Sequence, residues 1–404
     1  MKKMDPFKLL VSQEEAEILL LDNCVPIEKT QHVDLSEASA RVLAVDIKAD
    51  RNVPPFDRSA MDGYAVIAED TFEAQDTEVL LTLSGVIHAG EVAEVPVTRG
   101  HCLQIATGSP MPDGADAVVM VEYTEERNDK ILVTRPVYPG ANVSKAGEDI
   151  KIDEVVLSRG SLLTPARVGT IAALGMTHAE VYRKPQIAVI PTGREVVSPG
   201  ESLKPGHIYD VNSFTLESIL NANGGKVTRL SVVTDEKEAL TQAIERSLDY
   251  DMIVLSGGSS VGEKDLLAGI LENLGEILFH GVQIKPGKPT LFGVVQGKPV
   301  VGMPGYPTSC LSNAYVFLIP AVRKMARLPT LTERTVPAKL GKRIVSSSGR
   351  KQFLTVRIEN GIAYPVYKHS GAITSMAKAD GYIILPINLD VIEEGETVQV
   401  TMFE

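Results

Sequence analysis

The chain has 404 residues, a length that predicts two to four domains with substantial cores. Its composition, 44% hydrophobic and 23% charged, is that of an ordinary globular protein and excludes a low-complexity chain. The formal net charge of −12 argues against general binding to nucleic acid or acidic membranes, because such binding needs a basic face.

Cysteine usage and the N-terminal segment indicate the compartment. Cys24, Cys102 and Cys310 are widely spaced and form no C-x-x-C pair, so neither a disulfide framework nor a zinc site is predicted. We expect each to be a small buried residue. The first residues lack a signal-like apolar core, and no apolar run approaches the ~20 residues of a membrane span. A cytoplasmic protein without a membrane segment is therefore expected.

The N-terminal half changes from helical to strand-like patterns. Ser12 opens a capping box that predicts a helix through about Leu21, and residues 36–42 predict another short helical piece. From about residue 44, alternating apolar runs predict a β-rich insertion with strands at 79–83, 101–105, 117–121 and 130–134. Thr164 and Pro165 then begin a helix that ends before Gly175.

From residue 185 strands and helices alternate, which predicts a mainly parallel sheet with helices on both faces. The expected strands begin near residues 187, 227, 252 and 299, and Asp235 is expected to cap the helix after the second of them. Beyond residue 329, runs at 353–358, 362–366, 382–385 and 397–402 predict a small β-barrel-like domain.

The expected fold is therefore a multidomain α/β protein with a central doubly wound, mostly parallel sheet. We expect a discontinuous helical and extended linking domain (1–44 and 141–182), a β-rich inserted domain (45–140), the α/β domain (183–328) and a C-terminal β-barrel-like domain (329–404).

The segment from residue 251 to 265 is the most informative, because an apolar strand runs into a glycine-rich loop that ends on an acid. Gly257 and Gly258 let backbone N–H groups approach phosphate oxygens, and Ser256 and Ser259 add hydroxyl donors. Asp265, near the next helix start, is suited to holding a cation. A glycine-rich turn after a strand is more often a simple chain reversal, so this loop gains weight only from its neighbours.

Two further strands end in loops of the same design, at residues 191–195 (PTGRE) and 302–309 (GMPGYPTS). In an open parallel sheet such loops lie on one edge, so we expect the three to converge. Lys285 and Lys288 lie in a stiff KPGKP turn and form a plausible oxyanion clamp; two solvated lysines on a hairpin are the alternative.

Acidic residues at this edge indicate a divalent cation. Glu195, Asp210 and Asp265 all lie in loops or helix starts there, and Mg²⁺ needs only one or two carboxylates beside substrate phosphates. For Asp210, helix capping is an equally good interpretation.

Two loops of the inserted region are further candidates. Asp57 belongs to a charge-crowded loop, DRSAMD, typical of a ligand site or of an Asp-capped turn with local Arg58 pairing. Thr107 begins a TGSPMPDGAD segment for which a plain turn is the stronger interpretation. No Ser–His–Asp order or HExxH pattern supports acyl transfer or zinc hydrolysis.

With these residues assembled, the chain resembles the MoeA family, molybdopterin molybdenumtransferases, which share their fold with part of gephyrin. The resemblance covers essentially the whole length. Seven motifs match in the family's order: residues 57–65 (DRSAMDGYA), 107–116 (TGSPMPDGAD), 147–150 (GEDI), 191–195 (PTGRE), 256–262 (SGGSSVG), 285–289 (KPGKP) and 304–309 (PGYPTS).

The resemblance implies insertion of molybdate into the dithiolene of adenylylated molybdopterin, with Mg²⁺-dependent cleavage of the pyrophosphate link and release of AMP. It also implies a homodimer of four-domain subunits, whose active site forms between the sheet domain of one subunit and the inserted domain of the other. Transient contact with other molybdenum-cofactor biosynthesis proteins is expected.

Site residues follow from the same resemblance. Asp57, Glu195 and Asp265 would serve the metal and the hydrolytic step, with Glu195 and Asp265 as metal ligands. Lys285 and Lys288 would cradle the oxyanion. The implied substrate-binding residues are Thr107, Gly193, Asp210, Ser256, Gly257, Gly258, Ser259, Pro304, Gly305, Pro307, Ser309, Arg350 and Ser370.

Three positions depart from the familiar family pattern: Tyr306 in place of Asn, Ser259 in place of a β-branched residue, and Arg194 in place of an acid. They leave the reaction class standing but keep tungstate open as an alternative oxyanion. A non-catalytic gephyrin-like scaffold and the adenylyltransferase that acts one step earlier are two competing hypotheses. The retained acids and lysines argue against the scaffold, and the inserted and tail domains argue against the adenylyltransferase.

Overall fold

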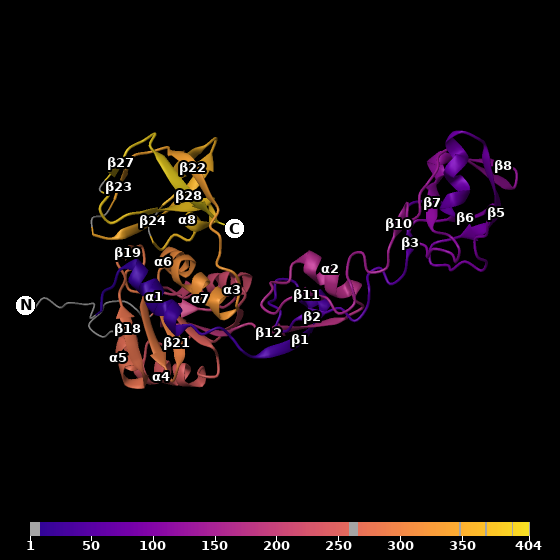
Figure 1. The fold of residues 1–404 in the computed structure, drawn as a ribbon. Helices are drawn as coiled ribbons and strands as arrows, with labels where there is room; N and C mark the ends of the chain where they lie inside the picture. The colour runs from indigo at the N-terminus through magenta and orange to yellow at the C-terminus, as the bar shows by residue number, and fades with distance from the viewer. Residues whose placement is uncertain (1–8, 258–265, 347–348, 368–369, 390, 404) are drawn as a thin grey trace, which may run out of the picture. The chain divides into compact units, whose positions relative to one another are not determined.

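The computed structural model describes residues 9–257, 266–346, 349–367, 370–389 and 391–403 (Figure 1). The chain divides into two compact units. Unit 1 comprises Met1–Gln31, Ala40–Val42 and Val181–Glu404, and unit 2 comprises His32–Ser39 and Leu43–Glu180. The finer division into four domains stays a prediction.

A six-stranded sheet forms the centre of unit 1, in the order β16-β13-β17-β21-β20-β18. Four neighbouring strands, from β16 to β21, are parallel, and β20 runs antiparallel to both of its neighbours. This confirms the predicted mainly parallel sheet. The strands are β13 (Gln186–Pro191), β16 (Lys226–Arg229), β17 (Met252–Ser256), β18 (Glu276–His280), β20 (Leu291–Val295) and β21 (Lys298–Met303).

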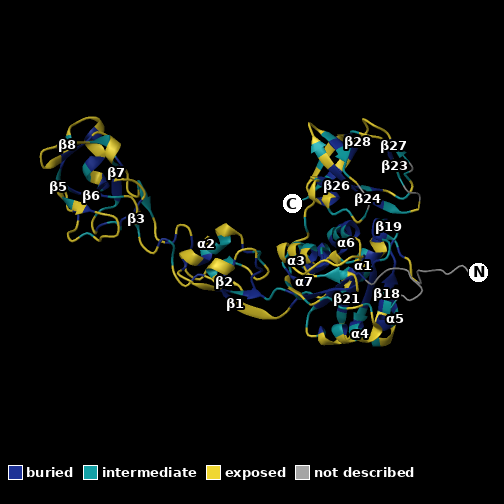
Figure 2. Cartoon of the chain, turned by 180° about the vertical axis from the view of Figure 1, so that it is seen from behind, coloured by how far each residue is buried: buried dark blue, intermediate teal, exposed yellow. Residues whose placement is uncertain are grey.

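Helices cover both faces of this sheet, and β17 is accordingly buried at every position and apolar at its first four. Met252 and Val254 belong to the core shared with α1, α3, α6 and α7, whereas Ile253 and Leu255 belong to the core shared with α4 and α5. In Figure 2, which is coloured by burial, the labels of β18 and β21 of this sheet stand between those of α4 and α5 and those of α6 and α7. The helices are α1 (Gln13–Asn23), α3 (Asn212–Ala222), α4 (Lys237–Arg246), α5 (Leu266–Leu274), α6 (Pro307–Asn313), the π-helical η4 (Ala314–Leu318) and α7 (Ile319–Met325).

Several local predictions hold and others are wrong. Ser12 caps α1 by accepting a hydrogen bond from the Glu15 N–H at 3.1 Å, as its capping box predicts. Asp235 does not cap α4: Glu236 occupies the cap position, without a side-chain hydrogen bond. The helical piece expected at residues 36–42 is reduced to the 3-10 helix η1 (Leu35–Glu37), because a left-handed Ala40 and turns follow it.

The C-terminal strands close into a barrel through the ring β24-β25-β22-β28-β26, in which β26 pairs again with β24. Its strands are β22 (Thr335–Leu340), β24 (Lys351–Glu359), β25 (Ile362–Pro365), β26 (Gly381–Leu385) and β28 (Thr397–Met402). The two-residue β19 (Ile284–Lys285) pairs with β24 and thereby ties the barrel to the α/β part of unit 1. Short elements complete it: β23 (Ile344–Val345), β27 (Val391–Ile392) and α8 (Thr374–Ala377).

Unit 2 contains a second six-stranded sheet, in the order β7-β4-β6-β5-β9-β8, which confirms the predicted β-rich insertion. Its strands are β4 (Gly63–Val66), β5 (Val79–Ile87), β6 (His101–Ile105), β7 (Ala117–Met120), β8 (Thr124–Arg127) and β9 (Lys130–Val133). Outside this sheet, Thr164 caps α2 (Pro165–Ala173) as predicted. The short β3 (Arg58–Ser59) pairs with β10 (Val143–Ser144), and β2 (Ile47–Lys48) pairs with β11 (Val155–Leu157).

All three cysteines are buried thiols, as expected. Burial raises the pKa of Cys24 to about 12 and that of Cys102 to about 12, so both are inert as nucleophiles near neutral pH. Among the described helices, none combines the length and the apolar character needed to cross a bilayer.

Candidate anion-binding site at the sheet edge

The carboxyl ends of β13, β17 and β21 lie side by side, as the sequence predicts. The Thr192 N–H donates to the Ser256 carbonyl at 3.0 Å, and the Gly257 N–H donates to the Met303 carbonyl at 3.1 Å. Hydrogen bonding thus continues one residue past each strand and joins the three loops at their first residues.

Gly257 lies where these loops approach most closely. Its φ of +101° belongs to a region that L side chains rarely adopt. A Cβ here would lie 2.7 Å from the Thr192 carbonyl oxygen, and a Cβ on Gly305 would lie 3.6 Å from the Gly257 Cα. Only glycine therefore fits. The predicted site residues Gly258, Ser259 and Asp265 lie outside the described residues.

Two acidic side chains lie close together beyond β13. The chain turns at Gly193, whose N–H donates to the Val233 carbonyl at 3.0 Å. A Cβ on Gly193 would lie 2.9 Å from Glu195 Oε2, so the Glu195 carboxylate lies against this turn. Burial raises the pKa of Asp235, and the neighbouring Glu195 raises it further, while Arg194 opposes both effects. Asp235 Oδ1 is buried and has no hydrogen-bond partner among the described residues.

Asp235 is the acidic residue that the sequence prediction missed as a site residue. It follows a segment that the sequence assigns to a strand, and Thr192 forms an isolated parallel bridge with Val233 just before it. The sequence signal for Asp235 was therefore an acidic residue after a fourth predicted strand. Because Asp235 also precedes a helix, the same signal predicts a helix cap.

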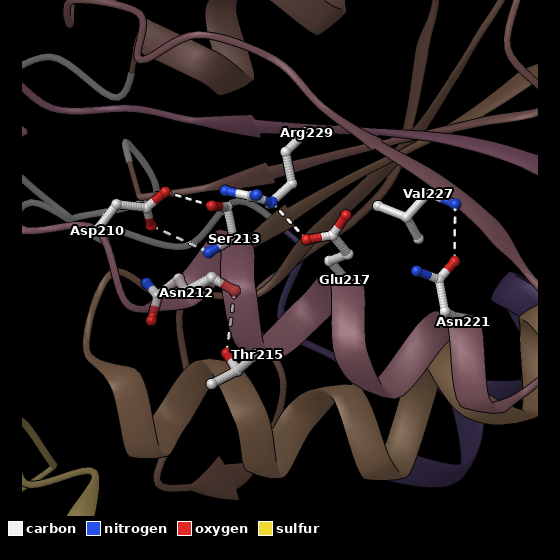
Figure 3. Close-up of polar contacts among 8 residues, drawn as sticks. All are labelled: Asp210, Asn212, Ser213, Thr215, Glu217, Asn221, Val227 and Arg229. Atoms are coloured by element: carbon white, nitrogen blue, oxygen red, sulfur yellow. Dashed lines mark hydrogen bonds and ion pairs between the residues drawn. The ribbon is translucent and has the colours of Figure 1, made fainter. Parts of the chain in front are cut away.

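Asp210 fixes the start of α3 (Figure 3). Its Oδ1 accepts a hydrogen bond from the Ser213 N–H at 3.0 Å, and its Oδ2 accepts one from the Ser213 hydroxyl. Val211 occupies the cap position itself, without a side-chain hydrogen bond, so Asp210 satisfies a first-turn N–H from the residue before the cap. Next to it, Asn212 Nδ2 donates to the Gly305 carbonyl at 2.8 Å, which ties this helix start to the loop after β21.

Further contacts hold α3 against the edge strand β16 (Figure 3). Glu217 forms an ion pair with Arg229, whose guanidinium lies 3.7 Å from the centroid of the Phe214 ring. Asn221 Oδ1 accepts a hydrogen bond from the Val227 N–H at 2.9 Å. The orientation of Asp210 and Asn212 is thus set by a helix anchored along its length.

The loop after β21 leads directly into α6. Pro304 is buried, Gly305 and Tyr306 are exposed, and Pro307 begins the helix that carries Ser309. Ser309 is 4% exposed.

A loop of the barrel lies on the first turn of α6. The Thr308 N–H donates to the Ser370 carbonyl at 3.0 Å, and the Thr308 hydroxyl donates to the Ala372 carbonyl at 3.2 Å. Ser370 therefore lies at the same edge as Ser309.

The lysine turn is held between the sheet and the barrel. Lys285 and Lys288 are half-buried, and the Val282 N–H donates to the Lys288 carbonyl at 2.9 Å. Lys285 pairs with Gln352 of β24, and the Lys351 N–H donates to the Gln283 carbonyl at 3.0 Å. Arg350 directly precedes β24 and so lies at the start of this pairing. The oxyanion clamp stays a prediction, as does the alternative of two solvated lysines.

Asp57 and Thr107 belong to unit 2, whereas the other predicted site residues belong to unit 1. The Asp57 carboxylate accepts hydrogen bonds from Lys145 Nζ and the Ala146 N–H, both at 2.8 Å. Both bonds lower the pKa of Asp57, and the bond from Lys145 has the larger effect. The Thr107 N–H donates to Asp62 Oδ1 at 2.7 Å, and this bond lowers the pKa of Asp62. The Asp57 carboxylate therefore pairs with Lys145, from a distant part of the chain, and not with Arg58 as the local alternative expected.

The described residues contain no cluster of three or more His, Cys, Asp or Glu side chains that could hold a metal ion by themselves. Two neighbouring carboxylates, as at Glu195 and Asp235, still suit Mg²⁺, which takes its remaining oxygen ligands from water and substrate phosphates.

A cavity of about 860 Å³ lies elsewhere in unit 1, between α3, α7 and the barrel. Of the predicted site residues that the structure describes, none lines it.

Family models match three consecutive parts of the chain. They are the MoeA N-terminal region (domain I and II) over residues 11–175, a probable molybdopterin-binding domain over 188–324 and the MoeA C-terminal region (domain IV) over 337–403.

Relatives match over nearly the whole length. A molybdopterin biosynthesis protein of Methanocaldococcus jannaschii is 35% identical over 93% of both chains. The molybdopterin molybdenumtransferase of Haemophilus influenzae is 30% identical over 98% of this chain and 99% of its own. A crystal structure of a molybdopterin biosynthesis MoeA protein from Pyrococcus horikoshii superposes with a TM-score of 0.83 at 40% identity, covering 98% of this chain and 99% of that one.

Proposed function

The chain belongs to the MoeA family, and from this premise we propose how its strand-terminal loops perform the reaction. It is a molybdopterin molybdenumtransferase of molybdenum cofactor biosynthesis, which inserts molybdate. We propose that the molybdopterin substrate is adenylylated, and that Mg²⁺-dependent hydrolysis of its pyrophosphate link accompanies insertion and releases AMP.

The observation that carries this proposal is the convergence of three glycine-containing loops at one edge of a parallel sheet. The Gly257 turn lets the loop after β17 lie directly against the loop after β13, because a Cβ on Gly257 would lie 2.7 Å from the Thr192 carbonyl oxygen. Backbone N–H groups in such turns are donors for phosphate oxygens. We therefore assign the loop beginning at Ser256 to the pterin and phosphate groups of the substrate.

Glu195 and Asp235 fit the requirement for Mg²⁺. Both offer hard oxygen ligands, and the buried Asp235 Oδ1 has no hydrogen-bond partner in the described part of the chain. A divalent cation there would relieve the unfavourable burial of the carboxylate. When bound, Mg²⁺ would neutralise charge on the substrate phosphates. Asp265, the other expected metal ligand, belongs to the same proposal.

Lys285 and Lys288 are proposed to hold the oxyanion. Molybdate and phosphate are both anions, so bringing them together is opposed by electrostatic repulsion. Cations fixed by a stiff turn reduce this repulsion without having to be ordered during the reaction. Further donors are assigned to Ser309 and Ser370, which lie at the same edge, and to Arg350, which directly precedes β24.

Asp57 is proposed to serve the hydrolytic step. Asp57 is a carboxylate held by Lys145 and the Ala146 N–H, and a carboxylate fixed in this way can accept a hydrogen bond from water and orient it. The proposal includes a homodimer. By the family resemblance, Asp57 and Thr107 of one subunit would contact the substrate bound to the sheet domain of the other subunit. The proposal also places the enzyme in the cytoplasm, in transient contact with other cofactor biosynthesis proteins.

A non-catalytic scaffold is disfavoured by Asp235. Burying a carboxylate oxygen without a partner destabilises a fold, and a scaffold would gain nothing in return. A metal site explains why such a group is present.

The test supplies purified protein with adenylylated molybdopterin, Mg²⁺ and either molybdate or tungstate, and measures AMP and metal-loaded cofactor. We expect AMP release that depends on both Mg²⁺ and the oxyanion. Faster turnover with tungstate would reassign the preferred oxyanion. Release of pyrophosphate from unmodified molybdopterin and ATP, with no insertion, would instead identify an adenylyltransferase.

A further inference from the structure

Asn313, the last residue of α6, is fully buried and holds the lysine turn through its side-chain amide. Its Nδ2 donates to the Gly287 carbonyl at 2.9 Å and to the Thr290 hydroxyl oxygen at 2.6 Å. The Thr290 hydroxyl itself donates to the Gly287 carbonyl at 2.9 Å. One amide therefore closes a small network within the segment that carries Lys285 and Lys288.

The backbone of the turn is packed directly on this amide. Gly287 has a φ of +106°, and a Cβ at this position would lie 2.3 Å from Asn313 Nδ2. The Asn313 Oδ1 is buried without a partner among the described residues. Because an unsatisfied buried oxygen is unfavourable, the two bonds donated by Nδ2 must compensate for it.

The position of Asn313 in the helix connects the turn to Ser309. These residues are four apart in α6, so their side chains lie on the same helix face, about 6 Å apart along the axis. The helix changes to π-helical geometry directly after Asn313, in η4, and such changes are frequent at functional sites. A single helix turn thus carries Ser309 at one end and the amide that binds the lysine turn at the other.

We propose that Asn313 is a positioning residue for the oxyanion: it fixes Lys285 and Lys288 relative to Ser309. This inference rests on the proposed function, which assigns those three residues to the oxyanion. Asn313 itself does not touch the substrate. Its effect is geometric, because a displacement of roughly 1 Å in a charged group that binds a reactant is enough to lower a rate about 100-fold.

The test compares Asn313→Ala, Asn313→Asp and Thr290→Val with the wild-type enzyme. We expect Asn313→Ala to raise the KM for molybdate by about 10- to 100-fold, while the KM for adenylylated molybdopterin changes less than about threefold. Asn313→Asp keeps the shape but removes the donor, so it should be similarly impaired. The Thr290→Val effect should not multiply with that of Asn313→Ala, since both residues belong to one network.

Met325→Ala is the matched control. Met325 is 2% exposed in the same core, so its truncation destabilises unit 1 without touching the lysine turn. We expect a wild-type KM for molybdate in this variant. If the KM for molybdate rises equally in Met325→Ala and Asn313→Ala, Asn313 acts only through general stability and the proposal is overturned.

Amide hydrogen exchange of residues 282–290 separates this inference from the proposed function. Exchange should accelerate at least about tenfold in Asn313→Ala relative to Met325→Ala, whether or not insertion is observed. Unchanged exchange, or a wild-type KM in both Asn313 variants, overturns the positioning role while the reaction stands. An inactive wild-type enzyme with accelerated exchange in Asn313→Ala overturns the proposed reaction alone.

Discussion

Substituting Gly257 tests whether the three loops are as close as the structure places them. Gly257→Ala introduces two separate penalties. The positive φ costs about 1–2 kcal/mol for a residue with a Cβ. The Cβ also lies 2.7 Å from the Thr192 carbonyl oxygen, a backbone atom that has to move, and such overpacking costs about 1–3 kcal/mol more. We expect a total destabilisation of about 2–5 kcal/mol.

Gly297 offers a control for the first penalty. It has a φ of +75° in the turn between β20 and β21, and a Cβ there would meet no atom within 4 Å. Gly297→Ala should therefore cost only about 1–2 kcal/mol and leave insertion activity intact.

Thermal unfolding of unit 1 distinguishes the two variants. With roughly 2–4 °C per kcal/mol for a unit of this size, Tm should fall about 2–12 °C further in Gly257→Ala than in Gly297→Ala. Molybdate insertion should be lost only in the former. Equal Tm values for the two variants, with activity retained in both, would refute the close approach of the loops at Gly257.

Three further outcomes are expected. Lys145→Ala should move the NMR titration midpoint of Asp57 upward, because Lys145 lowers the pKa of this carboxyl. In the wild type, the stabilisation from the Asp57–Lys145 pair is present above the unfolded-state pKa of about 3.9 and disappears as pH falls through the lower folded-state pKa. An unmoved midpoint would contradict the ion pair. Because burial raises the pKa of Asp235, ionisation of this carboxyl destabilises the fold as pH rises. Asp235→Asn should therefore unfold at a higher temperature than the wild type at pH 8, and the two unfolding temperatures should become equal below about pH 4. The same variant should lose Mg²⁺-dependent turnover. Lower stability at pH 8 would show that the ionised carboxylate has a partner. Asp251→Ala should destabilise unit 1 by about 3 kcal/mol in denaturant titrations, because it leaves the half-buried guanidinium of Arg183 without its 2.8 Å partner; a change below about 1 kcal/mol would contradict this.

The sheet and its functional edge could be predicted because their signals are local. The run 252–255 is apolar at every position and is followed by a serine and glycines, which indicates a strand buried on both faces with a loop at its end. Parallel topology then places such ends at one edge, and the contact of Gly257 with Thr192 and Met303 confirms it. Ser12 and Thr164 mark helix starts for an equally local reason.

Other features depend on contacts between distant residues and could not be read locally. Asp235 precedes a helix, as a cap would, and only the packing of the folded chain shows that its carboxylate is buried near Glu195. Asn313 lies in an apolar helix where nothing local indicates a partner, and its acceptors are 23 and 26 residues away in the chain. The resemblance to a known family did not identify either residue.

The central claim is that strand-terminal loops of unit 1 form a single pocket for negatively charged groups. Soaking crystals with tungstate and recording anomalous scattering at the tungsten edge tests it most directly, because the heavy atom locates the oxyanion without reference to activity. We predict a peak within hydrogen-bonding distance of Ser309 and of Lys285 or Lys288, which is lost in Lys285→Ala. A peak only in the cavity between α7 and the barrel, lined by Arg323 and Arg327, would contradict the account.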